Sequence, residues 1–300
     1  YSPKYIFSKR VLNNDLYLLK DNFRKSNVFS RDEVHDAKLH DDLALLLTTS
    51  GSTGSPKLVK LTKENIKSNA ESISEYLKIG CDDRAITSLP FNYSYGLSVI
   101  NSHLFSGGSI ILSNSSMMED KFWRSINDHS ATSIAGVPYN YEMMLRLGID
   151  NLDIPTIKKM TQAGGKLNYL KAKKVNDSLR LKGIDFYTMY GQTEATARIS
   201  YLPCGNIDKK PNSIGIPIPG GRLWLENEEG LKISNSKIVG EMIYEGLNVS
   251  MGYAESKEDL SIGDVNKGIL RTGDLAYYDE DGYYFIEGRN NRFVKVFGNR

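Results

Sequence analysis

Short apolar runs alternate with longer amphipathic segments between residues 43 and 200 of the chain. The apolar runs are too short for most helices and are predicted to form strands at 43–47, 85–89, 109–112, 132–135, 158–161 and 185–189. Between them, apolar positions recur at helical spacing, which predicts helices at 62–79, 96–105, 138–147 and 169–181. Such alternation of strands and helices is typical of α/β units.

The segment at 62–79 shows the helical pattern most clearly. Its apolar stripe consists of Ile66, Ala70, Ile73 and Leu77. Thr62 is predicted to cap the start of this helix through its hydroxyl, and Gly80 is predicted to mark its end.

The pattern changes after about residue 200, where Gly and Pro become frequent and the apolar runs become shorter. Strands are predicted at 223–226, 241–244 and 283–286, and the run from Asp279 to Gly282 is a turn signal. We therefore expect a layered α/β part over residues 1–200 and a β-rich, barrel-like subdomain over residues 201–287 packed against it.

A polar run, Thr-Thr-Ser-Gly-Ser-Thr-Gly-Ser-Pro-Lys, occupies 48–57 directly after the apolar run at 43–47. It offers many backbone N–H groups and hydroxyls, with Lys57 as a point charge, and such a loop can surround a polyanion. It is not the mononucleotide P-loop, because Pro56 precedes the lysine and Leu58 follows it. Taken alone, the run fits a flexible surface loop equally well.

Further segments follow this run in a fixed order, and together they resemble the adenylate-forming (AMP-binding) enzyme superfamily. That superfamily includes acyl-CoA synthetases, luciferases and peptide-synthetase adenylation domains. The matching segments after the polar run are Tyr190-Gly191-Gln192-Thr193-Glu194, Ser213-Ile214-Gly215 with Pro217, Gly240-Glu241 with Gly252-Tyr253, Arg271-Thr272-Gly273-Asp274, and Gly288-Arg289 running to Lys295, Gly298 and Arg300. The last of them, 288–300, looks like the family's hinge motif. The resemblance implies the family's large N-terminal domain, followed by a small C-terminal domain that this chain lacks. Because the chain starts at Tyr1 and stops within the hinge motif, we expect it to be an excerpt of a longer protein.

The resemblance implies an AMP-forming ligase that joins a carboxylic acid to ATP as an acyl-adenylate and then passes the acyl group to the thiol of CoA. ATP, Mg²⁺ and a thiol are the implied cofactors. An adenylation module that loads the phosphopantetheine of a carrier protein is one alternative. A nucleotide-binding fragment without full catalysis is another, because the family's catalytic lysine lies in the C-terminal domain. We therefore expect low activity from this excerpt alone.

The resemblance also assigns site residues. Thr53, Lys57, Thr193 and Glu194 are the implied catalytic residues, with Glu194 as the Mg²⁺ ligand. Residues implied in nucleotide binding are Ser50, Gly51, Ser52, Gly54, Gly164, Gly165, Tyr190, Gly191, Gln192, Asp274 and Arg289. Tyr93, Val137 and Pro138 are implied in the substrate pocket.

Simpler readings stay open for several of these side chains. Glu194 could be a solvated surface acid, Tyr190 a core tyrosine at a strand end, and Asp274 a turn-capping residue. Arg289 could be a surface arginine paired with Glu287.

Departures from the family pattern affect the expected substrate. Tyr93 stands where many acyl-CoA synthetases have a histidine that gates the acyl pocket. Asn92 is the nearest candidate for the aspartate that pairs with the ammonium group in amino-acid-activating members, and an amide lacks that charge. This argues against an α-amino acid substrate. Asn291 replaces the usual aspartate of the hinge.

Composition adds few constraints. Of 300 residues, 40% are hydrophobic and 25% are charged, and the net charge is +2, which is ordinary for a globular protein and gives no sign of a nucleic-acid partner. No apolar run approaches the roughly 18 residues that span a bilayer. The two cysteines, Cys81 and Cys204, lie far apart, which fits a reducing compartment such as the cytoplasm.

Overall fold

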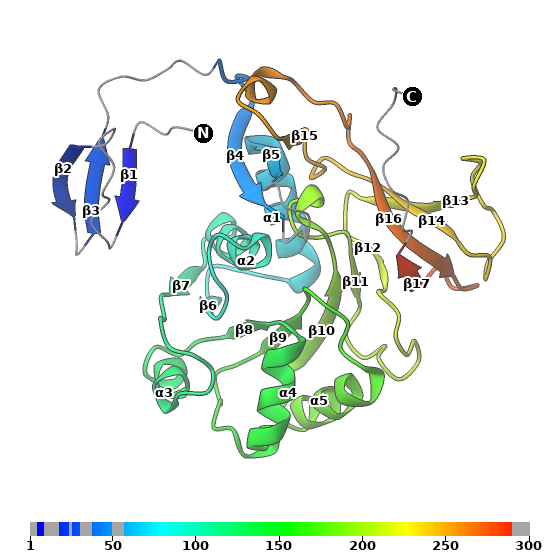
Figure 1. Cartoon of the computed structure of the whole chain (residues 1–300). Helices are drawn as coiled ribbons and strands as arrows, with labels where there is room; N and C mark the ends of the chain where they lie inside the picture. Colours follow the sequence, from blue (N-terminus) through cyan, green and yellow to red (C-terminus); the bar gives the residue numbers. More distant parts are fainter. Residues whose placement is uncertain (1–4, 9–17, 24–25, 31–37, 50–56, 290–300) are drawn as a thin grey trace.

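The computed structural model describes residues 5–8, 18–23, 26–30, 38–49 and 57–289 (Figure 1). Among these residues, the largest sheet has seven strands in the order β12-β11-β10-β9-β8-β6-β7. Its strands are β6 (Arg84–Ile86), β7 (Ser109–Ile111), β8 (Ser133–Gly136), β9 (Lys159–Gln162), β10 (Asp185–Tyr190), β11 (Ser200–Leu202) and β12 (Ile216–Pro217). Strands β6 to β10 pair in parallel, and β11 and β12 add antiparallel pairs at one edge.

Helices cover both faces of the parallel strands, so this part of the chain is a three-layer α/β/α arrangement (Figure 1). The helices are α1 (Lys63–Leu77), α2 (Ser94–Phe105), α3 (Asp120–Asp128), α4 (Pro138–Leu147) and α5 (Tyr169–Leu181), with short 3₁₀ turns η1 (Ile149–Asn151), η2 (Thr193–Ala195) and η3 (Glu258–Ser261).

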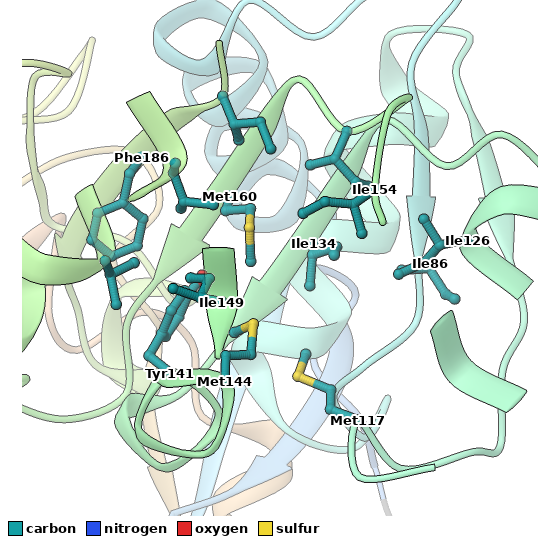
Figure 2. Packing of buried hydrophobic residues seen from close by; sticks show 14 of the residues in the cluster. Ile86, Met117, Ile126, Ile134, Tyr141, Met144, Ile149, Ile154, Met160 and Phe186 are labelled. Carbon is teal, nitrogen blue, oxygen red and sulfur yellow. The ribbon is translucent and has the colours of Figure 1, made fainter. Parts of the chain in front are cut away.

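Side-chain alternation along the strands divides the core into two layers. Ile134, Met160 and Phe186 point to the face covered by α3, α4 and α5, where they pack with Tyr141 and Met144 of α4 (Figure 2). The next residues along the same strands, including Ala135 and Tyr187, point to the face covered by α1 and α2. Strands buried on both faces can carry apolar residues at successive positions, as Ile134 and Ala135 do in β8.

Helix α1 shows how closely the sequence specifies local structure. The Thr62 hydroxyl accepts a hydrogen bond from the Asn65 N–H, as a capping residue should. The helix ends earlier than predicted, at Leu77, because Lys78 takes a left-handed conformation with φ 51°. Gly80 is therefore not the cap of this helix, and its N–H donates instead to Asp83.

The strand predicted at 85–89 is shorter in the structure, where β6 ends at Ile86. The chain turns out of the sheet in front of Pro90, a residue that restricts Leu89 before it and cannot donate to a sheet. Helix α2 begins at Ser94, two residues before the predicted start.

The remaining strands form smaller antiparallel sheets, which confirms the α/β class with a β-rich part. One sheet has the order β13-β14-β16-β17, a second β15-β5-β4, and a third β1-β3-β2. The strands are β1 (Tyr5–Ser8), β2 (Leu18–Phe23), β3 (Ser26–Ser30), β4 (Leu43–Thr48), β5 (Leu58–Thr62), β13 (Arg222–Glu226), β14 (Gly240–Glu245), β15 (Gly252–Ala254), β16 (Ile269–Tyr278) and β17 (Tyr284–Arg289). The predicted turn from Asp279 to Gly282 joins β16 to β17.

Within the described residues, no helix combines the length and the apolar character that crossing a bilayer requires. Cys81 and Cys204 are both exposed and unpaired.

Candidate functional site

The segments that follow the parallel strands meet at one edge of the seven-stranded sheet. Because β6, β8, β9 and β10 run in the same direction, the residues after each of them emerge on the same side. These residues include Tyr93, Val137, Gly164 and Gly191. The carboxyl edge of an open parallel sheet is where α/β proteins bind ligands.

Two adjoining cavities open at this edge. The strand-end cavity has a volume of about 510 Å³ and is lined by Thr49, Tyr93, Ser94, Tyr95, Ala163, Gly164, Tyr190, Gly191, Gln192, Thr193, Glu194, Ala197, Arg198, Asp274 and Arg289. The side cavity, of about 290 Å³, shares Gly164, Tyr190, Gly191 and Asp274 with it and is otherwise largely apolar, with Leu167, Leu202, Ile207 and Ile286 among its walls. A polar chamber and an apolar chamber are therefore joined at four residues from three separate motifs.

A hydrogen-bonded cluster holds Asp274 at the junction of the two cavities. The Tyr190 hydroxyl donates a short hydrogen bond to the Asp274 carboxylate, and Gln192 Nε2 donates to the same carboxylate oxygen at 3.0 Å. Gln192 Nε2 also contacts the Thr272 carbonyl oxygen at 2.9 Å. Burial, followed by the negative charge of Asp274, raises the pKa of Tyr190 well above its ordinary value, so this phenol keeps its proton.

Arg289 also reaches this cluster, with Nε 3.6 Å from Asp274 Oδ1, although its side chain is 74% exposed. This contact links the Gly288-Arg289 segment to the junction of the two cavities. A carboxylate fixed by two donors and still open to a cavity can accept hydrogen bonds from a bound polyol.

Glu194 also lines the strand-end cavity and belongs to the 3₁₀ turn η2. Its carboxylate accepts a hydrogen bond from the Tyr253 hydroxyl at 2.6 Å. Burial, reinforced by the Glu194 charge, raises the pKa of Tyr253. Lys57 lies next to this pair, with Nζ 5.8 Å from the centre of the Tyr253 ring and 2.5 Å from Glu255 Oε1. Ser94 Oγ lies 3.2 Å from Thr193 Oγ1, so hydroxyls and charges gather at this end.

The donor set here fits magnesium better than a metal that requires several protein ligands. Among the residues the structure describes, no group of three or more His, Cys, Asp or Glu side chains could hold a metal ion. Mg²⁺ is commonly bound through one or two carboxylates together with substrate phosphates and waters, and Glu194 can supply such a carboxylate.

The structure brings together most of the residues that the sequence singled out. Gly164, Tyr190, Gly191, Gln192, Thr193, Glu194, Asp274, Arg289 and Tyr93 all line the strand-end cavity, and Gly165 lines the side cavity. Val137 and Pro138 pack directly behind the glycine pair, since a Cβ placed on Gly164 would lie 3.2 Å from Val137 and one on Gly165 would lie 3.2 Å from Pro138. Ser50, Gly51, Ser52, Thr53 and Gly54 lie outside the described residues.

Six wall residues were not among the site residues assigned from the sequence: Thr49, Ser94, Tyr95, Ala163, Ala197 and Arg198. Arg198 is the least expected of them, because only 1% of the residue is exposed. The one indication in the sequence that Arg198 belongs to the site was its closeness to the Tyr190–Glu194 segment.

The backbone between η2 and β11 turns sharply just before Arg198. Thr196 and Ala197 both adopt positive φ angles, 53° and 98°, which side chains of L-residues rarely allow. Asn248, itself only 4% exposed, holds this turn from both ends, with Nδ2 2.7 Å from the Ala195 carbonyl oxygen and 2.8 Å from that of Arg198.

Replacing Asn248 by alanine is expected to lower the free energy of unfolding by about 2–3 kcal/mol, because two buried carbonyl groups would lose their donor. The Tyr244 hydroxyl, which donates to Asn248 Oδ1 at 2.8 Å, would lose its acceptor as well. Urea unfolding of the two proteins measures this difference. A change below about 0.5 kcal/mol, the level of an ordinary surface substitution, would contradict the role assigned to Asn248.

Comparison with known proteins places this architecture in a family. Residues 7–254 match the family described as AMP-binding enzyme. Oxalate–CoA ligase from Arabidopsis thaliana is 28% identical over 265 residues, which are 87% of this chain and 50% of that protein. Luciferin 4-monooxygenase from Luciola mingrelica is 26% identical over 270 residues, which are 89% of this chain and 48% of that protein.

A solved structure of O-succinylbenzoate coenzyme A synthetase from Bacillus subtilis in complex with AMP superposes with a TM-score of 0.72 and 28% identity, over 84% of this chain and 50% of that one. The same synthetase has also been solved with ATP and a magnesium ion. This chain spans about half the length of the curated relatives it matches. The resemblance drawn from the ordered motifs is confirmed, and the chain belongs to the AMP-binding enzyme family.

Proposed function

We propose that this chain forms the nucleotide- and acid-binding part of an AMP-forming ligase that converts a carboxylic acid and ATP to an acyl-adenylate and pyrophosphate, and then forms a thioester with CoA. The observation that carries this proposal is the junction of the two cavities at Asp274, with Tyr190 and Gln192 fixing its carboxylate and Glu194 and Thr193 at the polar end. Family membership and the nucleotide-bound structures of the Bacillus synthetase support it.

In this proposal the nucleotide lies across both cavities. The apolar side cavity takes the adenine, with Gly164 and Gly165 allowing close approach to the backbone and the Tyr190 ring forming a wall. The Asp274 carboxylate, at the junction, accepts hydrogen bonds from the ribose hydroxyls. The phosphates then extend into the strand-end cavity, towards Thr193, Glu194 and Lys57.

The reaction itself needs orientation and charge neutralisation more than covalent help from the protein. An oxygen of the substrate carboxylate attacks the α-phosphorus, and the bond from that phosphorus to the bridging oxygen of pyrophosphate breaks. Thr193 would donate its hydroxyl to an α-phosphate oxygen, and Lys57 would neutralise the leaving phosphates. Mg²⁺, held by Glu194, would neutralise further phosphate charge. The second half-reaction, with CoA or with a carrier-protein phosphopantetheine as acceptor, remains a prediction.

Replacing Glu194 by glutamine is expected to slow acid-dependent pyrophosphate exchange about 100-fold, because one electrostatic contact to the reacting phosphates is lost. The amide oxygen can still accept the hydrogen bond from Tyr253, so the local fold should persist. The measurement is exchange of labelled pyrophosphate into ATP by the complete gene product, across a panel of short, long, dicarboxylic, aromatic and aminoacyl acids.

Glu280→Gln is the matched control, because Glu280 is exposed, lies in the turn that joins β16 to β17, and pairs with the exposed Lys237. It should leave the exchange rate within twofold of the parent. Absence of exchange with every acid would refute the proposed activity, and equal rates for the Glu194 and Glu280 variants would refute the role of Glu194.

A further inference from the structure

We propose that Arg198 recognises a second anionic group on the acid, so that the substrate class is an acid with an additional carboxylate or sulfonate. This inference rests on the proposed function, and it goes beyond that function by naming the chemistry of the acid. It is carried by the burial of Arg198, by its lack of a negatively charged partner among the residues that the structure describes, and by its place in the cavity wall.

Arg198 is among the largest fully buried side chains of the protein, with 1% of the residue exposed. Its guanidinium lies 4.1 Å from the centre of the Tyr95 ring. Nη1 contacts the Ala197 carbonyl oxygen at 3.4 Å, the side chain also hydrogen-bonds with the Tyr76 phenol, and Nε has no hydrogen-bond partner among the described residues. No acidic side chain in the described part of the chain forms an ion pair with it.

An arginine cannot discard its charge to relieve this burial, because the guanidinium stays protonated in proteins. Burying an uncompensated charge costs several kcal/mol. The neighbouring phenols do not supply the missing negative charge. Burial raises the pKa of Tyr95 and of Tyr93, with the Arg198 charge only partly opposing this, and it raises the pKa of Tyr76 to about 12. A stacked ring offsets part of the cost, but an anion from outside the chain would offset more.

Arg198 lies where such an anion can reach it. It lines the strand-end cavity together with Tyr95 and with Tyr93, which the resemblance implies in the substrate pocket. It also lines a cavity of about 20 Å³ in the core behind it, among Ile73, Leu77 and Val99. Its side chain therefore lies between the open cavity and the core.

The backbone gives independent support for a fixed, functional orientation. The strained turn at Thr196 and Ala197 immediately precedes Arg198, and Asn248 binds the carbonyl of Arg198 itself. Positive φ angles at two successive L-residues are unfavourable and persist where the surroundings enforce them. Here the backbone conformation keeps the charged Arg198 side chain inside the protein, although burial removes water from the guanidinium.

The test uses acyl-sulfamoyl adenosines, stable mimics of the acyl-adenylate, titrated calorimetrically into the protein. Each acyl chain, from two to six carbons, is made in two matched forms, one ending in a carboxylate and one in the carboxamide of nearly equal shape. At the best chain length, the carboxylate form should bind about 30-fold more tightly than the carboxamide, as for a charge-assisted hydrogen bond in a buried site. Sulfonate-ended analogues should share the preference.

Variants then assign the preference to one residue. Arg198→Met, which keeps much of the side-chain length, should bring the carboxylate-to-carboxamide ratio close to one, and Arg198→Lys should keep part of it. Arg222→Met removes one positive charge from an exposed position on β13 and should leave the ratio unchanged. Because the ligand pair is compared in the unaltered protein first, the result does not depend on the Arg198 variants folding.

The outcomes separate this inference from the function on which it rests. Equal binding of carboxylate and carboxamide forms at every length, with loss of both in Asp274→Ala, would leave the nucleotide site standing and overturn the role of Arg198. A preference that survives in Arg198→Met would also overturn it. Failure of every analogue to bind would overturn both the proposed function and the inference.

Discussion

Replacing Gly191 by alanine is expected to destabilise the protein by about 3 kcal/mol or more and to abolish nucleotide binding. A Cβ at this position would lie 1.9 Å from the Ala197 carbonyl oxygen, 2.6 Å from its carbonyl carbon and 2.9 Å from the Arg198 Cα. All three are backbone atoms of the strained turn, so no side chain can move aside to make room. The segments at 190–192 and 197–198 would have to separate, which would displace Tyr190 and Gln192 from Asp274.

Urea unfolding and titration with an acyl-adenylate mimic measure the two effects in the same preparation. Gly80→Ala is the matched control, because a Cβ there would meet no atom within 4 Å. That variant should differ from the parent by less than about 1 kcal/mol and bind the mimic normally. A Gly191→Ala protein with parental stability and affinity would show that the turn can relax, and that the contact between these segments is not needed for the site.

Local structure was predictable wherever a single segment carries its own signals. The helix predicted at 169–181 is α5, with the same bounds, because its apolar stripe is regular and Asn168 caps it. The turn before β17 was recognisable from Asp279 to Gly282 for a similar local reason. By contrast, β5 was not predicted. Lys60 interrupts its apolar pattern, and the ammonium is satisfied by the carbonyls of Asp259 and Ile262, about 200 positions away.

The site was predictable only in part from the residues themselves. A loop of Ser, Gly and Thr with a lysine points to phosphate binding, but nothing local pairs Tyr190 with Asp274, which lie 84 positions apart. The resemblance assigned both residues to nucleotide binding, but it did not predict the hydrogen bond between them. Arg198 could not be found by either route, because its chemistry depends on its burial and on the absence of a negatively charged partner among the described residues. A sequence shows neither of these properties.

Replacing Asp83 by asparagine is expected to lower the free energy of unfolding by about 3–5 kcal/mol, since it leaves the buried Lys159 ammonium without its counter-charge. The two side chains are each 10% exposed, and Lys159 Nζ lies 3.1 Å from Asp83 Oδ2. Asp83 also accepts hydrogen bonds from the Gly80 N–H and the Thr132 hydroxyl, both at 2.9 Å. Lys159 in turn binds the carbonyls that end α1. The pair thus fastens α1 to the starts of three neighbouring strands.

The stabilising effect of the Asp83–Lys159 pair should also depend on pH. Burial acts to raise the pKa of Asp83, but the Gly80 N–H and the Lys159 ammonium outweigh it, so the pKa lies below its ordinary value. A carboxylate with a depressed pKa stabilises the fold above the unfolded-state pKa of about 3.9, and this contribution disappears as the pH falls through the lower, folded-state pKa. Melting temperature should therefore fall less steeply below about pH 4 in Asp83→Asn than in the parent.

The double variant Asp83→Asn with Lys159→Met separates the pair from its surroundings. It should cost clearly less than the sum of the two single changes, because removing both charges leaves no unpaired ion. Additive costs would contradict the assigned coupling.

The Asp83–Lys159 ion pair lies at the amino edge of the parallel strands, whereas both cavities open at the carboxyl edge. Below its melting temperature, Asp83→Asn should thus bind acyl-adenylate mimics with parental affinity, while Gly191→Ala should not, which would place stability and recognition at opposite ends of one sheet.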